Sequence, residues 1–199
     1  MKSFIFLVLS FHLLWGQNSF KNIKDQYFKS YDYEQMGRYT EAIKVLSPLY
    51  QKYPKGYTLN LRFGWLFYLD KKYNDAISYY KQASLINSSA LDPKLGLIRV
   101  YLKRAQFQKA EIVAYELLKI DYYNYYANLY IVQALIAQNK YEIALKMIHK
   151  MLALYPTDIT YLERLAIIYQ QTNSTYLTKL YEDILILDPN NILVRSALK

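Results

Sequence analysis

Apolar side chains recur along most of the chain at spacings of three and four residues, which places them on one face of an α-helix. Short polar turns, such as Gly37–Arg38 and Asn139–Lys140, interrupt this pattern at regular intervals. The pattern predicts pairs of helices from about residue 20 onward. The predicted helices span residues 25–35, 39–50, 57–69, 73–86, 91–103, 107–120, 125–138, 141–154, 161–171 and 176–187, followed by a short helix over 192–199.

Two landmarks repeat every 34 residues through four copies of the pair. One is an alanine, and the other is an aromatic residue three positions before it. A fixed period in the range of roughly 20–50 residues is the sequence signature of a stacked repeat array. We expect the alanine where the two helices of a pair approach closely, with the aromatic ring one turn back on nearly the same face. The landmarks are Ala42, Ala76, Ala110 and Ala144, and Tyr39, Tyr73, Phe107 and Tyr141.

The fifth pair follows this period less closely. Leu177 or Thr178 falls where the period requires an alanine. Pro156 and Pro189, which end the fourth and fifth pairs, are 33 residues apart rather than 34. Terminal repeats are often atypical because they cap the stack. The array is therefore predicted to cover residues 20–191, with residues 192–199 forming a C-terminal cap or the start of a truncated repeat.

The second copy most clearly resembles the tetratricopeptide-repeat family, and the resemblance extends over residues 23–190. The resemblance implies an all-α solenoid of about five antiparallel helix pairs in a right-handed superhelix, with a short C-terminal capping helix. It also implies a concave groove, lined by the first helix of each pair, that holds a peptide or a segment of a partner protein. The matching positions are Phe63, Gly64, Phe67, Tyr73, Ala76, Tyr80 and Ala83. Gly64 is replaced in the other copies by Ser30, Ile98, Val132 and Ala166.

The groove geometry of this family, transferred position by position, gives a candidate partner-binding surface on the first helices of four copies. Aromatic residues and arginine are the usual energetic anchors of protein interfaces, so Trp65 and Tyr68 are favoured as contacts over the leucines. The alternative interpretation is that several of these side chains pack against the adjacent pair instead. The candidates are Tyr27, Tyr31 and Glu34; Leu61, Trp65, Tyr68 and Leu69; Leu95, Arg99 and Leu102; and Leu129, Gln133 and Ile136.

A subset of the family grips acidic chaperone tails with a clamp of lysine, asparagine and arginine. At the matching positions this chain has one basic residue, Arg62. The other matching positions hold Tyr27, Tyr31, Asp92 and Gly96. The resemblance therefore does not extend to that function.

The first residues have the pattern of a secretory signal peptide. Lys2 supplies a positive charge, an apolar run covers residues 4–15, and Gly16 precedes a polar stretch. We expect cleavage after Gly16, so that residues 1–16 form the signal peptide and the mature protein is periplasmic or exported. The alternative is an uncleaved leader that anchors the chain, although its apolar run is shorter than the roughly 20 residues that span a bilayer.

Composition sets further bounds on function. Hydrophobic residues make up 53% and charged residues 21%, as in a globular protein. The formal charge is +9, but the lysines are scattered singly, which favours a solvated basic surface over nucleic-acid binding. There are no cysteines, which removes disulfides, thiol catalysis and thiolate metal sites. The 24 tyrosines have two interpretations, the codon bias of an AT-rich genome or selection for a binding surface.

Motifs that carry catalysis are missing from the sequence. It contains no H-E-x-x-H, no G-x-S-x-G and no glycine-rich phosphate loop. His149 would be the only histidine of the mature chain, and it falls beside two lysines on a helix surface. We therefore expect neither an enzyme nor a bound cofactor or metal.

Together these observations favour a non-catalytic scaffold of the bacterial cell envelope that binds a segment of another protein in an apolar, aromatic groove. The alternative is a membrane-surface protein, held by an uncleaved leader, that assists an envelope assembly or export complex. Both interpretations imply a protein partner, no nucleic acid, and membrane contact only through the leader.

Overall fold

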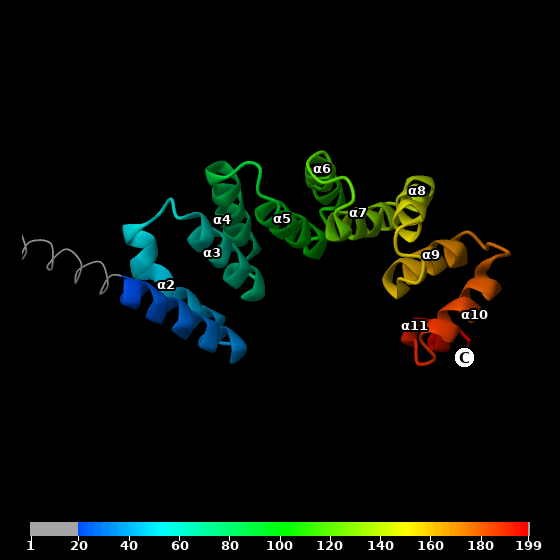
Figure 1. The fold of residues 1–199 in the computed structure, drawn as a ribbon, viewed down its shortest axis with the longest axis horizontal. Coiled ribbons are helices and arrows are strands. Elements are labelled where there is room, and N and C mark those ends of the chain that lie inside the picture. The colour runs from blue at the N-terminus through cyan, green and yellow to red at the C-terminus, as the bar shows by residue number, and fades with distance from the viewer. Residues whose placement is uncertain (1–19, 199) are drawn as a thin grey trace, which may run out of the picture. The chain divides into compact units, whose positions relative to one another are not determined.

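The structure is a computed structural model that describes residues 20–198, and all regular secondary structure in that range is helical (Figure 1). The predicted signal peptide lies outside the described residues. A helix over residues 20–35 opens the described chain. The helices that follow are α2 (Tyr39–Lys52), α3 (Tyr57–Leu69), α4 (Tyr73–Ile86), α5 (Asp92–Lys103), α6 (Phe107–Leu118), α7 (Tyr125–Ala137), α8 (Tyr141–Leu152), α9 (Ile159–Gln171), α10 (Leu177–Leu187) and α11 (Ile192–Ala197). The predicted bounds of α2 to α10 are confirmed to within two residues.

The described chain divides between Pro93 and Lys94 into two compact units. In the first unit, α2 packs on α3, and α3 packs on α4. In the second unit, each helix from α6 to α10 packs on the helix that follows it, and α7 also touches α9. This succession of neighbour contacts is the arrangement of a helix-pair solenoid, so the predicted all-α fold class is confirmed.

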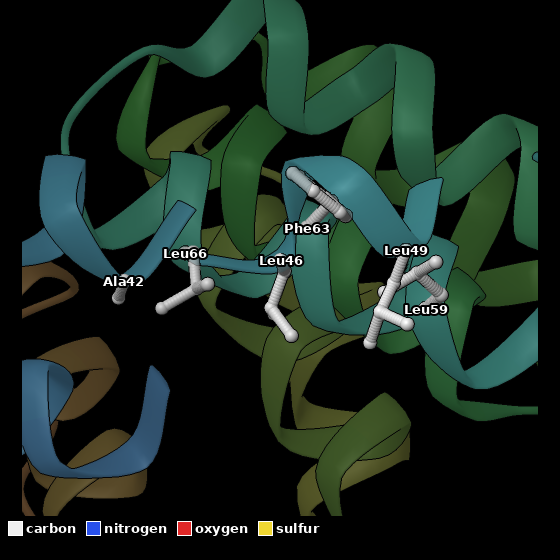
Figure 2. Close-up of a cluster of buried hydrophobic side chains, with 6 residues drawn as sticks. All are labelled: Ala42, Leu46, Leu49, Leu59, Phe63 and Leu66. Atoms are coloured by element: carbon white, nitrogen blue, oxygen red, sulfur yellow. The ribbon is translucent and has the colours of Figure 1, made fainter. Parts of the chain in front are cut away.

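A row of hydrophobic side chains between α2 and α3 forms a core cluster of the first unit (Figure 2). Aromatic rings border this row. The rings of Phe67 and Tyr79 are nearly parallel with centroids 5.2 Å apart, and Tyr50 meets Tyr79 edge-on at 5.3 Å. Such ring pairs add stability beyond the area that they bury. The row contains Ala42, Leu46 and Leu49 from α2, and Leu59, Phe63 and Leu66 from α3.

The alanine landmarks are fully buried, which fits the close contact predicted within each pair. Glycine has the same role in the second pair, because a Cβ added at Gly64 would stand 2.7 Å from ring carbons of Tyr80. No side chain larger than hydrogen fits there without movement of the Tyr80 ring, which is itself buried. The contact between α3 and α4 therefore depends on glycine at position 64. The fully buried alanines are Ala42, Ala76, Ala110 and Ala144.

The two helices of each pair are joined by a turn in which one residue has a positive φ angle, in the left-handed region. The residue after each turn donates its N–H to a carbonyl five residues back, as Lys72 does to Phe67 and Ser174 does to Tyr169, both at 2.9 Å. This hydrogen bond is typical of a helix that ends at a left-handed residue. These residues are spaced by 34 positions, and the spacing extends into the fifth pair. The φ angles are 71° at Gly37, 59° at Lys71, 53° at Ala105, 57° at Asn139 and 51° at Asn173.

The fifth pair departs from the period after its turn. Thr175 and Tyr176 lie between this turn and the next helix, which begins only at Leu177. As a result Thr178 is exposed, and the buried fourth residue of α10 is Leu180. Ala144 is the buried fourth residue of α8. The expectation that residue 177 or 178 takes the place of the alanine is therefore wrong, because the longer turn shifts the helix.

The predicted C-terminal helix is confirmed as α11. Asn191 caps it by accepting a hydrogen bond from the backbone N–H of Val194 at 3.1 Å. Asn124 and Asp158 cap α7 and α9 in the same way, at 3.0 and 3.1 Å. Because α7 and α9 are the first helices of the fourth and fifth pairs, α11 begins as the first helix of a further pair would.

Substitutions at the turns should change stability in opposite directions. Ala105→Gly is expected to raise the free energy of unfolding by roughly 0.5–1 kcal/mol. The relief of backbone strain at a positive φ exceeds the entropy that glycine adds to the unfolded chain. Gly37→Ala is expected to lower it by a similar amount, and backbone strain is the cause, since an added Cβ at Gly37 meets no atom within 4 Å. Urea unfolding measures the free energy of unfolding of both variants and of the wild type. A loss of stability in both would contradict the role assigned to the left-handed turn.

Candidate functional site

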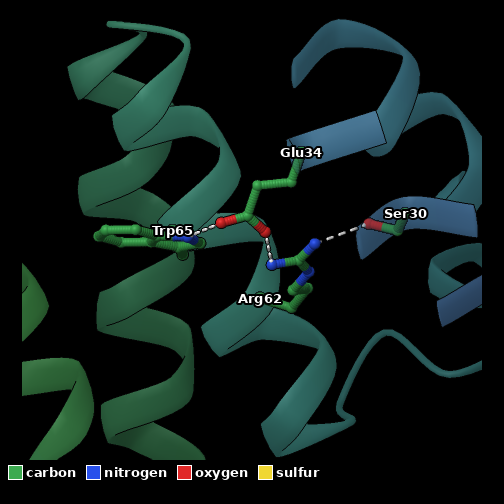
Figure 3. Close-up of polar contacts among 4 residues, drawn as sticks. All are labelled: Ser30, Glu34, Arg62 and Trp65. Carbon is green, nitrogen blue, oxygen red and sulfur yellow. Dashed lines mark hydrogen bonds and ion pairs between the residues drawn. The ribbon is translucent and has the colours of Figure 1, made fainter. Parts of the chain in front are cut away.

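A polar cluster lies within the candidate surface of the first unit, where the helix over residues 20–35 faces α3 (Figure 3). Arg62 on α3 is buried, with 7% of its surface exposed. Its Nη1 forms an ion pair with Oε2 of Glu34, and its Nη2 donates to Oγ of Ser30 at 3.2 Å. Trp65 Nε1 donates to the other carboxylate oxygen, Oε1 of Glu34, at 2.6 Å. One carboxylate therefore holds two side chains of α3.

The spacing along each helix makes this arrangement possible. Ser30 and Glu34 are four residues apart on the first helix, and Arg62 and Trp65 are three apart on α3. Residues at these spacings share one face of a helix. A buried ion pair contributes favourably only when its remaining donors and acceptors are also satisfied. Ser30 and Trp65 provide two of those contacts, whereas Nε of Arg62 is buried without a hydrogen-bond partner. The charges of Glu34 and Arg62 therefore neutralise each other in a cluster that satisfies most, but not all, of its polar atoms.

Aromatic rings extend this cluster along the surface. Tyr31 lies over the Arg62 guanidinium, with 3.9 Å between Cζ and the ring centroid, and 47% of Tyr31 is exposed. Trp65 stacks on Tyr68 with centroids 5.6 Å apart, and both residues are partly buried. Tyr31, Trp65 and Tyr68 together are called the aromatic strip below.

The remaining candidates of the first unit surround the aromatic strip. Leu61 and Leu69 are partly buried on α3. The hydroxyl of Tyr27 lies 3.4 Å from Oγ1 of Thr58, and the Tyr27 side chain lines a pocket. Tyr27 is one helical turn before Tyr31, so the pocket and the aromatic strip share the first helix.

The candidates of the second unit differ in exposure. Spacings of three and four residues place each set along one side of its helix. On α7, Gln133 is exposed, whereas Leu129 and Ile136 are partly buried. The set on α5, which is partly buried throughout, consists of Leu95, Arg99 and Leu102.

The bonds of the polar cluster join residues that are distant in sequence. Arg62 is 28 residues from Glu34 and 32 from Ser30, so neither contact leaves a local pattern. The period contains one clue, because Ser30 occupies in the first copy the position of Gly64 in the second. In the fold, Oγ of Ser30 accepts a hydrogen bond from the Arg62 guanidinium.

A group of exposed tyrosines in the second unit is absent from the predicted site. Tyr122, Tyr123 and Tyr126 each expose more than half of their surface. The rings of Tyr122 and Tyr123 meet edge-on at 4.9 Å, and Lys150 Nζ lies 3.9 Å from the Tyr122 centroid. The density of tyrosines over residues 122–126 is the sequence signal that points to this group.

The described part of the chain contains neither a candidate metal site nor a membrane-spanning helix. Among residues 20–198, no group of three or more His, Asp or Glu side chains is placed to hold a metal ion. None of the helices described is both long enough and apolar enough to cross a membrane. His149 is exposed near the end of α8, on the helix surface where it was expected.

The chain matches no protein-family model and no curated protein. Several solved structures are similar to it. A tetratricopeptide-repeat protein from Parabacteroides merdae has a TM-score of 0.80 at 17% identity, over 88% of this chain and 70% of that one. MamA from Desulfovibrio magneticus RS-1 has a TM-score of 0.76 at 14% identity, over 86% and 97%. YrrB, described as a tetratricopeptide-repeat protein with an unusual peptide-binding site, has a TM-score of 0.71 at 12% identity, over 87% and 90%.

These similarities place the chain among the α-helical repeat proteins. More narrowly, its fold is that of the tetratricopeptide repeat, which confirms the resemblance found around Gly64 and Ala76 in the second copy.

The ion pair can be tested by removing its members in turn. Glu34→Leu leaves the Arg62 guanidinium buried without its counter-charge, which is expected to cost about 3–5 kcal/mol of folding stability. Arg62→Met in the same chain removes that charge, so the double variant should be more stable than Glu34→Leu alone. Urea unfolding of the wild type, both single variants and the double variant measures the coupling. Strictly additive effects would show that the two side chains do not stabilise each other.

Proposed function

We propose that this protein is a non-catalytic scaffold that binds a segment of another protein along the aromatic strip. The observation that carries the proposal is the strip itself. Tyr31, Trp65 and Tyr68 present ring surface from two helices. Glu34 holds Trp65 by a hydrogen bond, the Arg62 guanidinium lies against Tyr31, and Tyr68 stacks on Trp65. Aromatic residues in such fixed positions are typical energetic anchors of protein interfaces.

The chemistry of the aromatic strip favours a segment with little charge. Arg62 is already paired with Glu34 and bonded to Ser30. A carboxylate from a partner would have to compete with Glu34 for the same guanidinium. Apolar and aromatic side chains can instead cover the rings, and each Å² of apolar surface removed from water contributes roughly 25 cal/mol. The expected partner segment is therefore neutral and partly apolar.

Trp65 is held in place before a partner arrives. Its indole N–H bonds to Glu34, and its ring stacks on Tyr68. Immobilising a free side chain on binding costs roughly 0.5–1.5 kcal/mol, and a ring that is already ordered avoids most of that loss. The polar cluster therefore supports binding indirectly, by fixing the orientation of the side chain that would contact the partner.

The fold supports the same function. YrrB is described by its peptide-binding site, and stacked helix pairs provide extended surfaces along which a chain segment can lie. Because unrelated functions share one fold, the support specific to this protein comes from the aromatic strip rather than from the fold.

We further propose that the protein acts in the bacterial cell envelope. The support is the signal-peptide pattern of residues 1–16, with Lys2 before an apolar run and Gly16 after it. The intact mass of the protein from envelope fractions is expected to lack residues 1–16. A full-length mass would favour the alternative in which the leader anchors the protein to a membrane.

The aromatic strip is tested by capture of the partner and by truncation of the rings. A photo-crosslinking residue in place of Tyr31 captures the partner from envelope extracts, and mass spectrometry identifies the bound segment. Trp65→Ala and Tyr68→Ala are then expected to weaken binding of that segment by about 30-fold, as loss of about 2 kcal/mol at an interface anchor implies.

Tyr126→Ala is the matched control, since Tyr126 is an exposed tyrosine of the second unit. It should leave the affinity unchanged. Thermal unfolding of all three variants separates binding from folding. A loss of stability large enough to explain the weakened binding would show that Trp65 or Tyr68 is a core residue and would contradict the proposal.

A further inference from the structure

The first unit contains an apolar pocket of about 290 Å³ one helical turn from Tyr31. The buried side chains of Leu49 and Leu59 line it, and they lie together at one end of the hydrophobic row in Figure 2. Tyr27 and Tyr53 line its sides. Tyr53 is 39% exposed, so one side of the pocket borders on solvent. The rest of the lining consists of Ile23, Gly56 and Thr58.

The second unit shows which group fits at the equivalent place. Tyr161 is three 34-residue periods after Leu59, and Tyr125 is three periods after Ile23, so these residues occupy equivalent positions in the repeat. Tyr161 is fully buried, and its ring meets that of Tyr125 edge-to-face with centroids 5.4 Å apart. The Tyr161 hydroxyl donates to the backbone carbonyl of Tyr125 at 2.9 Å. In the second unit, the chain itself therefore supplies an aromatic ring.

The surroundings of that ring correspond in part to those of the pocket. Tyr155 occupies the position of Tyr53, and buried Met151 occupies that of Leu49. The Tyr155 ring lies 5.9 Å from that of Tyr125. Other positions differ, because Ile23, Tyr27 and Gly56 of the pocket correspond to Tyr125, Leu129 and Asp158. With leucine at position 59 instead of a tyrosine, α3 supplies no ring to this space in the first unit.

We propose that the pocket of the first unit binds one aromatic ring, supplied by a side chain of the partner segment. The source of the ring rests on the proposed function, whereas the preference for a ring follows from the comparison of the two units. An apolar cavity of about 150 Å³ is large enough to bind benzene, so this pocket admits a phenyl or phenol side chain.

The lining of the pocket matches such a ring in geometry and in charge. Tyr27 and Tyr53 allow the edge-to-face contacts that aromatic pairs prefer. The lining residues carry no formal charge, which suits a neutral group. The hydroxyls of Tyr27 and Thr58 are 3.4 Å apart in a long hydrogen bond, and either can bond to a phenol oxygen. These features favour a tyrosine or phenylalanine side chain over an aliphatic one.

The first test uses p-cresol, which is the side chain of tyrosine without its backbone. Saturation-transfer NMR is expected to show binding to the wild-type protein in the millimolar range, with weaker binding of cyclohexanol. Leu59→Tyr places a ring in the pocket, as Tyr161 does in the second unit, and should abolish p-cresol binding. Absence of binding to the wild type, or equal binding to the Leu59→Tyr variant, would overturn the proposal.

A second pair of variants keeps the test valid if the Leu59→Tyr protein does not fold. Tyr53→Ala removes one side of the pocket and should weaken p-cresol binding about two- to tenfold, as loss of one ring contact implies. Tyr155→Ala, at the equivalent position of the second unit, should have no effect. Equal effects of these two substitutions would assign p-cresol to another place and overturn the proposal.

The source of the ring is tested with the captured partner segment. The Leu59→Tyr variant should bind that segment more weakly than the wild type does, and replacing the aromatic residue of the segment by alanine should have no further effect on the variant. Unchanged affinity would overturn the assignment of the ring to the partner but leave the proposed function intact. Failure of the Trp65 and Tyr68 variants to affect binding, with p-cresol still bound, would instead contradict the proposed function and leave the pocket as a ring-binding site.

Discussion

The close approach of the two helices within each pair is the constraint on which the rest of the structure depends. At Gly64 the backbone of α3 lies against the Tyr80 ring, and the alanine landmark of each of the first four copies is fully buried. A larger group would separate the helices of that pair. Since each pair packs mainly on its neighbours, the displacement would pass to the next interface. The hydrophobic row between α2 and α3 and the aromatic rings that border it fill the space between these helices.

The parts of the fold that could be predicted from the sequence are those with a local cause. Helix bounds follow from apolar spacing and from turn residues such as Gly37, and the alanine contacts follow from their repetition. The fifth pair shows the limit of such reasoning. Because the turn is two residues longer, the buried position of the second helix is Leu180 rather than Thr178. At the same time, α10 is shorter than α8. The total length of the copy changes little, so the change in helix phase is hidden in the sequence.

The candidate site shows a different limit. Position within the repeat is enough to select Tyr31, Trp65 and Tyr68 as surface candidates. It does not reveal that Glu34 bonds to both Arg62 and Trp65, because contacts across about 30 residues depend on how each helix is rotated about its axis. In the sequence, no residue near Arg62 indicates that it forms an ion pair with Glu34. In the fold it is buried and neutralised, so it supports the orientation of neighbouring rings rather than attracting an anion.

The left-handed turns explain how a chain of this kind can diverge. Glycine, lysine, alanine and asparagine all occupy the turn position in one or another copy, because backbone hydrogen bonds maintain its shape whichever side chain is present. Each copy can therefore exchange residues at a modest energetic cost while its helices stay in phase. Architecture then outlasts sequence similarity, and solved structures superpose on this chain at only 12–17% identity. The same tolerance lets individual copies specialise. One copy can fill a space with its own side chain, whereas another copy can leave the equivalent space open to a ligand.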